Sequence, residues 1–133
     1  MPEPGVTGAA PVPLCASEEL AELGQAVCFD VEEFGRKAPA FAVRHEGQVR
    51  AFLNRCAHVP AEMDWQPGQF WDADRRYIVC SIHGALYEPT TGRCVSGPCR
   101  GARLLPIRTA EQGGQVCWYP DERIQPLSNP SHP

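Results

Sequence analysis

Residues 80–87 read Cys-Ser-Ile-His-Gly-Ala-Leu-Tyr, and this stretch decides how the rest of the chain is interpreted. Upstream, residues 54–58 read Asn-Arg-Cys-Ala-His. Together the two stretches contain a C-x-H motif and a C-x-x-H motif separated by twenty-one residues. The Cys and His of these motifs are Cys56, His58, Cys80 and His83. Two thiols and two imidazoles in such closely spaced pairs are typical of metal ligands. The sequence therefore predicts a metal site built by two separate loops.

This ligand set fits either zinc or an iron–sulfur cluster. A structural zinc ion would take all four groups in one tetrahedron. In a [2Fe-2S] cluster with mixed ligands, the two Cys bind one iron and the two His bind the other. One Cys and one His in each loop favour the cluster, since zinc fingers usually place two Cys in one knuckle and two His in the other.

The residues that follow the second Cys-His pair also favour an iron–sulfur cluster over zinc. Gly84 follows the second His directly, where a residue without Cβ can pass close to a cluster. Tyr87, Thr91-Gly92 and Gly97-Pro98 follow it. Here the chain resembles the Rieske [2Fe-2S] family, whose second loop reads C-P-x-H-G-x-x-F/Y-D-x-x-T-G followed by G-P. The resemblance covers about 14–119. It implies one [2Fe-2S] cluster per chain, held by Cys56, His58, Cys80 and His83 and surrounded by Gly84, Tyr87, Gly97 and Pro98.

Two departures from the family pattern affect the loops. Ser81 stands where Pro is usual, which loosens the turn but keeps the ligand spacing. The gap between the two ligand pairs is longer than is common in the family. We expect the excess to form an enlarged hairpin over about 64–76, around Gln66-Pro67-Gly68 and Asp72-Ala73-Asp74.

Short alternating segments separated by turn residues predict an all-β sandwich or barrel. The expected strands lie at 14–16, 27–31, 41–44, 49–53, 70–71, 77–79, 104–108 and 115–119, the last two as a closing hairpin. Ser17 should cap a helical turn over 17–20, and Pro106 suggests an edge strand or a bulge. The resemblance implies antiparallel sheets with a cluster-binding subdomain inserted at about 54–100. Proline-rich residues 1–13 and 120–133 should be a flexible arm and tail around one domain at 14–119.

Composition narrows the function classes. A net charge of −4 and a pI near 5.5 imply no general affinity for nucleic acid. The sequence shows neither a signal peptide nor an apolar run long enough for a membrane helix, so we expect the cytoplasm and no membrane association. Seven Cys in such a chain suggest a reducing compartment and metal use. Cys15, Cys28 and Cys117 should be buried as small hydrophobic residues, and His45 should be an exposed turn residue.

The surroundings of the motif also bear on its redox behaviour. High-potential members of the family carry a disulfide between the two loops and a Ser two residues after the second His. Here Ile82 and Ala85 stand in the second loop instead, so we expect a reduction potential toward the low end of the roughly −150 to +300 mV Rieske range. Tyr87 keeps a hydroxyl that could reach a ligand sulfur. Arg93 and Arg100 bracket the Gly97-Pro98 loop and should form a basic collar suited to an acidic partner.

Three functions fit these features. The preferred one is a Rieske-type electron carrier, not an enzyme in itself, between a flavin reductase and a terminal enzyme such as an oxygenase. The second is a small accessory subunit resembling that of assimilatory nitrite reductase. The third is an iron–sulfur redox sensor that works through a reversible disulfide of Cys94 and Cys99.

Overall fold

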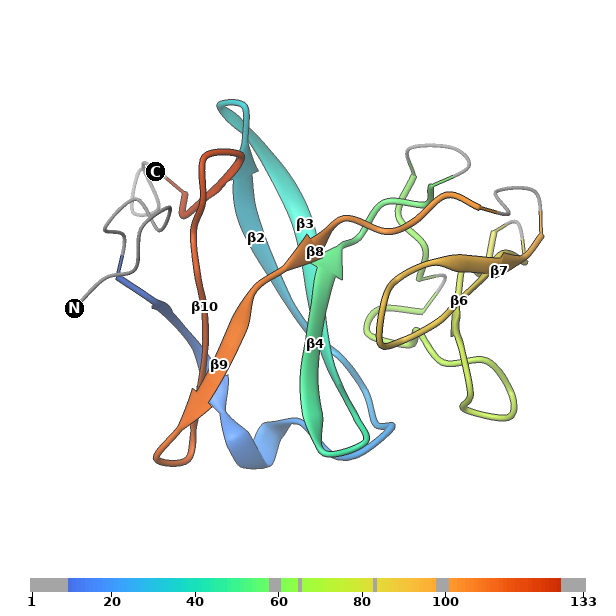
Figure 1. The fold of residues 1–133 in the computed structure, drawn as a ribbon, viewed down its shortest axis with the longest axis horizontal. Helices are drawn as coiled ribbons and strands as arrows, with labels where there is room; N and C mark the ends of the chain where they lie inside the picture. Colours follow the sequence, from blue (N-terminus) through green and yellow to red (C-terminus); the bar gives the residue numbers. More distant parts are fainter. Residues whose placement is uncertain (1–9, 58–60, 65, 83, 98–100, 128–133) are drawn as a thin grey trace.

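A computed structural model describes residues 10–57, 61–64, 66–82, 84–97 and 101–127 of the chain. Within these ranges the protein is nearly all β, as the sequence predicts, and its only helix is the single 3-10 turn η1 (Ser17–Glu19) (Figure 1). No helix in the described ranges is long and apolar enough to cross a membrane.

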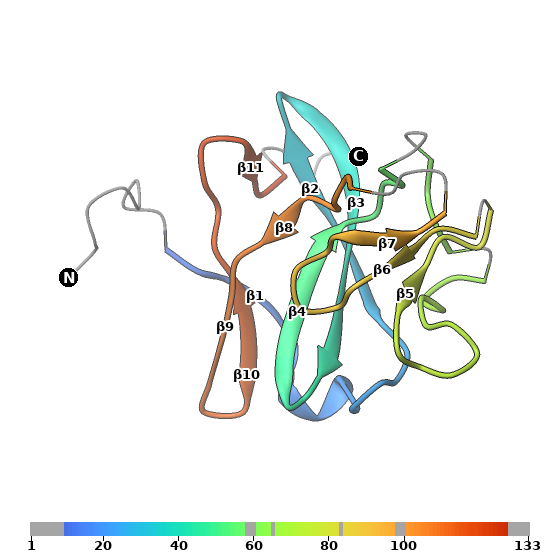
Figure 2. The ribbon, with the colours of Figure 1, turned by 45° about the vertical axis from the view of Figure 1, so that its right-hand side comes forward.

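The strands of the described residues form three antiparallel sheets. Five strands make the largest sheet, in the order β11 (Ile124–Gln125), β2 (Val27–Glu33), β3 (Arg36–His45), β4 (Gln48–Leu53) and β8 (Pro106–Ile107). A second sheet has the order β1 (Val12–Ala16), β10 (Gln115–Trp118) and β9 (Thr109–Gln112). The third has the order β5 (Ile78–Val79), β6 (Leu86–Tyr87) and β7 (Cys94–Ser96). Figures 1 and 2 show this third sheet set to one side of the other two.

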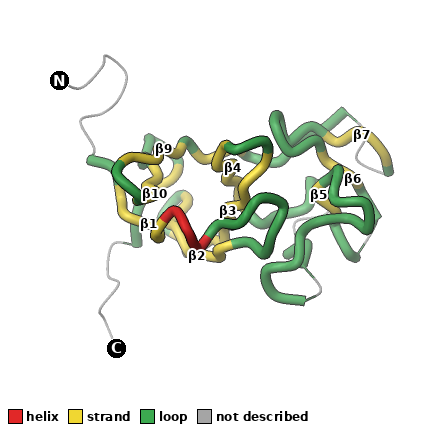
Figure 3. Tube along the Cα trace, turned by 90° about the horizontal axis from the view of Figure 1, so that it is seen from below, coloured by secondary structure: helices red, strands yellow, loops and turns green. Residues whose placement is uncertain are grey.

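Strand β3 is covered on both faces, which explains its continuous apolar sequence. Phe41 and Val43 belong to a core shared with the third sheet. Ala40 and Ala42 belong to a second core, shared with the β1-β10-β9 sheet. Successive strand residues point to opposite faces, so one strand serves both cores. The alanines on this face fill little space between the two sheets of the sandwich. Figure 3 shows β1, β9 and β10 on one side of β3 and β4, and the third sheet on the other.

A two-residue turn at Glu46 and Gly47 joins β3 to β4 as a hairpin. Glu46 and Gly47 both have positive φ, 53° and 76°, and β3 and β4 pair from His45–Gln48 to Ala40–Leu53. A two-residue turn with positive φ at both positions has a backbone twist that matches the twist of the flanking strands. This hairpin fixes the register of β4, which delivers the chain to Cys56.

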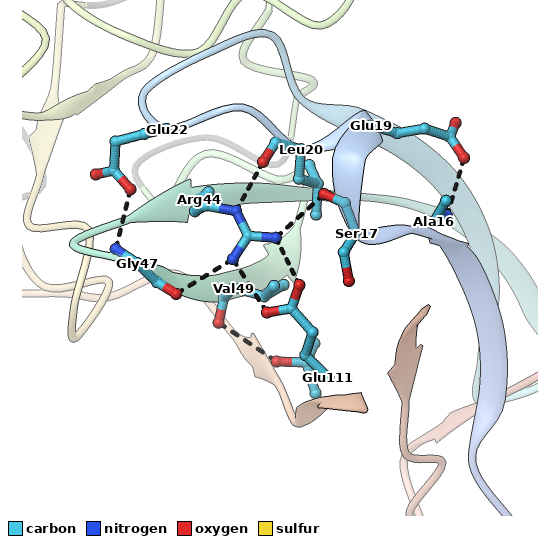
Figure 4. A network of polar contacts seen from close by, with 10 residues as sticks. Ala16, Ser17, Glu19, Leu20, Glu22, Arg44, Gly47, Val49 and Glu111 are labelled. Carbon is cyan, nitrogen blue, oxygen red and sulfur yellow. Dashed lines mark hydrogen bonds and ion pairs between the residues drawn. The ribbon is translucent and has the colours of Figure 1, made fainter. Parts of the chain in front are cut away.

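One charged network ties η1 to this hairpin (Figure 4). The guanidinium of Arg44 donates to the Leu20 carbonyl oxygen at 2.7 Å and to the Ser17 carbonyl oxygen at 3.2 Å. It also makes a two-pronged ion pair with Glu111 of β9, at 3.0 and 2.7 Å. Arg44 therefore fastens both sheets of the sandwich to the segment between them.

Two sequence expectations about this sandwich are wrong. Ser17 does not cap η1, because Ala16 occupies the N-cap position and its backbone N–H bonds the Glu19 carboxylate at 2.9 Å. The closing hairpin pairs β9 with β10 and not 104–108 with 115–119. The strand at Pro106–Ile107 pairs with β4 instead, where Pro106 lies on an edge of the five-stranded sheet as predicted.

Three side chains and one segment also differ from expectation. His45 is the last residue of β3, half-buried with its ring 6.1 Å from that of Trp71, and not an exposed turn residue. Cys15 is buried as predicted, but Cys28 is exposed and Cys117 is only partly buried. In the predicted tail, Ile124–Gln125 forms β11 against β2, and Ile124 is buried.

The hairpin expected over about 64–76 is present only in part and is shifted to 71–78. Trp71 pairs with Ile78 through an isolated antiparallel bridge, and the carboxylate of Asp72 accepts backbone bonds from Arg76 and Tyr77 in the turn between them. The indole N–H of Trp71 donates to the Gly24 carbonyl oxygen at 2.9 Å. This bond anchors the long loop to the sandwich.

Candidate metal centre

Cys56 and Cys80 lie in one buried cluster, although they come from different loops. Cys56 follows β4 and is 2% exposed, and Cys80 follows β5 and is 0% exposed. The Cys56 N–H bonds the Ala61 carbonyl oxygen at 2.9 Å, and the Cys80 N–H bonds the Ala85 carbonyl oxygen at 2.9 Å. Each loop therefore turns back on itself directly after its cysteine.

Asn54 shapes the first loop, a role that the sequence analysis missed. Its side chain is buried, accepts a bond from the Met63 N–H at 2.8 Å and donates to Asp64 at 2.8 Å. Its amide thus joins the two ends of the loop that carries Cys56. A polar residue that ends an apolar strand two positions before a ligand is the signal that could have revealed it.

Glycine is required at two places in the second loop. Gly84 has φ +74°, and its N–H bonds the Cys80 carbonyl oxygen at 2.7 Å, which closes a turn after Cys80. Gly97 has φ +104°, and a Cβ there would lie 2.8 Å from the Cα of Ala85. The sequence predicted both glycines near the site, but not that Gly97 permits close packing of two loop backbones.

Tyr87 reaches across from the second loop to the first. Its side chain is fully buried, and its hydroxyl oxygen lies 3.3 Å from Sγ of Cys56 and 2.9 Å from the backbone N of Ala57. The expectation that Tyr87 can reach a ligand sulfur agrees with this geometry. The sulfur in question is that of Cys56, which stands here for a metal-bound thiolate.

His58, His83 and Pro98 lie outside the described residues, so their part in the ligand set remains a prediction. The described residues fit an iron–sulfur group on chemical grounds. Buried thiolates need compensating positive charge, which iron supplies. Tyr87 also offers a hydroxyl at hydrogen-bond distance from one of the two sulfurs.

A buried carboxylate lies behind the first loop. Glu33 of β2 pairs with Arg55, directly before Cys56, and with Nε of Arg123 at 2.6 Å. Burial alone would raise the pKa of Glu33, but the hydrogen bonds from the two guanidinium groups outweigh it and lower that pKa. This triad was not foreseen, because its members lie far apart in the sequence.

Of the two arginines predicted to form a basic collar, only Arg93 lies within the described residues. Arg93 is exposed and forms an isolated antiparallel bridge with Arg103. Arg100 and Cys99 lie outside the described residues, so neither the collar around them nor a pairing of Cys99 with Cys94 is described. Cys94 is buried in β7, and its thiol donates to the Ser96 carbonyl oxygen at 3.4 Å. Ile82 and Val95 are exposed apolar residues, 50% and 38% accessible.

Two buried cysteines from two loops, in the core between a small sheet and an antiparallel β-sandwich, fit a small iron–sulfur domain. The family model described as "Rieske [2Fe-2S] domain" matches residues 10–119. The chain therefore belongs to the Rieske [2Fe-2S] domain family, and its cofactor is a [2Fe-2S] cluster. When bound, such a cluster supplies one-electron chemistry.

Solved structures share this fold. The ferredoxin of carbazole 1,9a-dioxygenase from Nocardioides aromaticivorans IC177 is 24% identical with a TM-score of 0.67, over 85% of this chain and 100% of that one. A chain from a complex of reduced oxygenase and oxidized ferredoxin in carbazole 1,9a-dioxygenase is 21% identical with a TM-score of 0.63. The match covers 85% of this chain and 95% of that one. The terminal oxygenase from the same Nocardioides strain is 22% identical with a TM-score of 0.64, over 91% of this chain but 33% of its own. No curated protein sequence matches this chain.

Proposed function

We propose that this chain is a soluble, cytoplasmic Rieske-type ferredoxin that passes single electrons from a reductase to a terminal, oxygenase-like enzyme. In this role it is a carrier and not itself an enzyme. Cys56 and Cys80 hold one iron, and His58 and His83 hold the other and face the partner.

The observation that carries the proposal is the convergence of Cys56, Cys80 and Tyr87 in one buried cluster beneath the two loops. Such a site serves electron storage, since it buries the thiolates and gives one of them a hydrogen-bond donor. Further support comes from likeness to the carbazole dioxygenase ferredoxin, whose whole length this chain spans.

Metal analysis tests the ligand set. We expect the purified protein to be brown, with about two irons and two acid-labile sulfides per chain, as a Rieske cluster requires. His58→Ala and His83→Ala should each lose the cluster or change its visible and electron paramagnetic resonance spectra. His45→Ala is the matched control and should leave them unchanged. One zinc ion and no sulfide per chain would overturn the proposal.

Electron transfer tests the role. A flavin reductase with NADH should reduce the cluster, and a terminal oxygenase should reoxidise it, each step followed by its visible spectrum. Genome neighbours provide a second test, because oxygenase and reductase genes favour the carrier. Siroheme-enzyme genes nearby, with no reduction by any flavin reductase, would favour the nitrite reductase subunit instead.

A further inference from the structure

An open pocket of about 350 Å³ lies beside the first ligand loop, and its polar lining is dominated by arginine. Arg55, Arg103 and Arg123 line it together with Cys56. Leu104 and Leu105 supply apolar walls. Three chain segments that are distant in sequence thus converge on one basic hollow next to a predicted iron ligand.

The guanidinium groups of Arg55 and Arg123 are both held in place by one buried carboxylate, that of Glu33. Arg55 and Arg123 each give one nitrogen to the buried Glu33 carboxylate. A guanidinium has five N–H donors, so both retain donors for a further anion. Their side chains are 38% and 44% exposed, which leaves them accessible from the pocket. Glu33 therefore orients both arginines while balancing only one of their two charges.

Arg103 adds a positive charge that takes part in none of the ion pairs among the described residues. Its side chain is exposed and forms no ion pair within the described ranges. Its backbone bridges that of Arg93, and both arginines line a neighbouring hollow together with one acidic residue, Glu88. Like charges directly opposite each other in a β-bridge repel. An anion seated at Arg103 would relieve that repulsion.

We propose that this arginine pocket binds acidic side chains of the redox partner, so that the partner docks beside Cys56. The inference rests on the proposed electron-carrier function and names its docking chemistry. Carboxylates are the matching ligands, because the planar fork of arginine pairs with them through two parallel hydrogen bonds. The leucine walls displace water and strengthen such pairs. A partner held there abuts a residue that ligates the cluster.

Binding is tested on the intact holoprotein with tris(oxalato)chromate(III), a redox-inert trianion that presents carboxylate groups. Calorimetry should show saturable binding, weakened about threefold to tenfold by Arg103→Gln, as expected for the loss of one nearby charge. Arg76→Gln is the matched control, since it removes the same charge from an exposed turn that does not line the pocket. Equal affinities for wild type and Arg103→Gln, or equal losses in both variants, would overturn the pocket.

Electron transfer gives a second readout. Reduced protein passes one electron to tris(oxalato)cobaltate(III) or to hexaamminecobalt(III), and Co(III) becomes Co(II) in each case. Arg103→Gln should slow the reaction with the anionic oxidant about threefold to tenfold and not slow that with the cationic one. If both rates are unchanged, the pocket is refuted and the carrier function stands. If the protein cannot be reduced and reoxidised at all, the carrier function itself fails.

Discussion

The hydroxyl oxygen of Tyr87 lies 3.3 Å from Sγ of Cys56 and accepts the N–H of Ala57 at 2.9 Å. A metal-bound thiolate carries no proton, so with iron on Cys56 the Tyr87 hydroxyl is the donor and the sulfur the acceptor. A hydrogen bond to a ligating thiolate favours the more negative, reduced state of the site. Tyr87 should therefore raise the reduction potential.

We expect Tyr87→Phe to lower the midpoint potential by about 20–60 mV, the one-electron equivalent of a hydrogen bond of about 1 kcal/mol. Spectroelectrochemical titration measures the shift. Tyr119→Phe is the control, because Tyr119 packs against Arg108 away from the two ligand loops. An unchanged potential in Tyr87→Phe would mean that the hydroxyl does not donate to the sulfur.

The residues of the second loop also bear on the absolute reduction potential of the wild-type protein. Ile82 is half exposed, and Ala85 is fully buried without a hydroxyl, so two features of high-potential relatives are missing from the second loop. Tyr87 keeps a hydroxyl at hydrogen-bond distance from the Cys56 sulfur. The midpoint of the wild-type protein should lie toward the low end of the roughly −150 to +300 mV range. A midpoint near the top of that range would contradict this account.

The Arg44–Glu111 pair should make stability depend on pH. Hydrogen bonds from Arg44 lower the pKa of Glu111 from 4.5 to about 2. A carboxyl whose pKa is lower in the folded state stabilises the fold above the unfolded pKa, and this contribution disappears as pH falls from about 4.5 toward 2. Because the Glu111 side chain is 30% exposed, solvent reduces the contribution to about 1 kcal/mol.

Glu111→Gln should accordingly lower the free energy of unfolding by about 1 kcal/mol at pH 7. Its difference from wild type should shrink as pH falls below about 4.5. Urea unfolding at several pH values measures both effects. Glu122→Gln, at an exposed position without a described ion pair, should cost little at any pH. A Glu111→Gln deficit that is independent of pH would refute the ion-pair explanation.

The sequence predicted what local patterns encode. The C-x-H and C-x-x-H spacing indicated the Cys pair, and the alternating residues of β2, β3 and β4 indicated the central sheet. The same reasoning placed the closing strand at 104–108, because Leu104, Leu105 and Ile107 look alike in an apolar pattern. In the structure Leu104 belongs to the core under the ligand loops and Ile107 to the sandwich core. Periodicity cannot reveal that a chain changes sheets between two apolar residues.

Polar contacts between residues far apart in the sequence could not be predicted from it, for a related reason. Glu33 meets Arg123 across ninety positions of sequence, and Arg44 meets Glu111 across sixty-seven. Such pairs depend on the register of several strands at once. Tyr87 was foreseen only as a candidate, since whether it packs or donates depends on where the other loop lies.

Gly97→Ala should disturb the metal centre. Gly97 has φ +104°, and an added Cβ would lie 2.8 Å from the Cα of Ala85, a backbone atom that cannot easily move. We expect a loss of about 2 kcal/mol or more in stability, together with faster cluster loss. Gly101→Ala is the matched control, because φ there is +93° but the added Cβ would meet no atom within 4 Å. Equal cluster lifetimes in the two variants would show that backbone strain alone, and not the contact with Ala85, decides the effect.

Strand β11 adds a buried side chain and a positioned arginine to the edge of the five-stranded sheet. Ile124 is 2% exposed, its strand pairs with β2 at Glu33, and the neighbouring Arg123 donates to the Glu33 carboxylate. Ile124→Ala should cost about 2–4 kcal/mol, and Ile124→Val about 1 kcal/mol, in urea unfolding of the holoprotein. Since Arg123 also lines the arginine pocket, Ile124→Ala should weaken tris(oxalato)chromate(III) binding as well. Val95→Ala, at a 38% exposed position, should change neither quantity appreciably. If Ile124→Ala proves as mild as Val95→Ala, residues 124–125 contribute nothing to the core, and Glu33 alone positions Arg123.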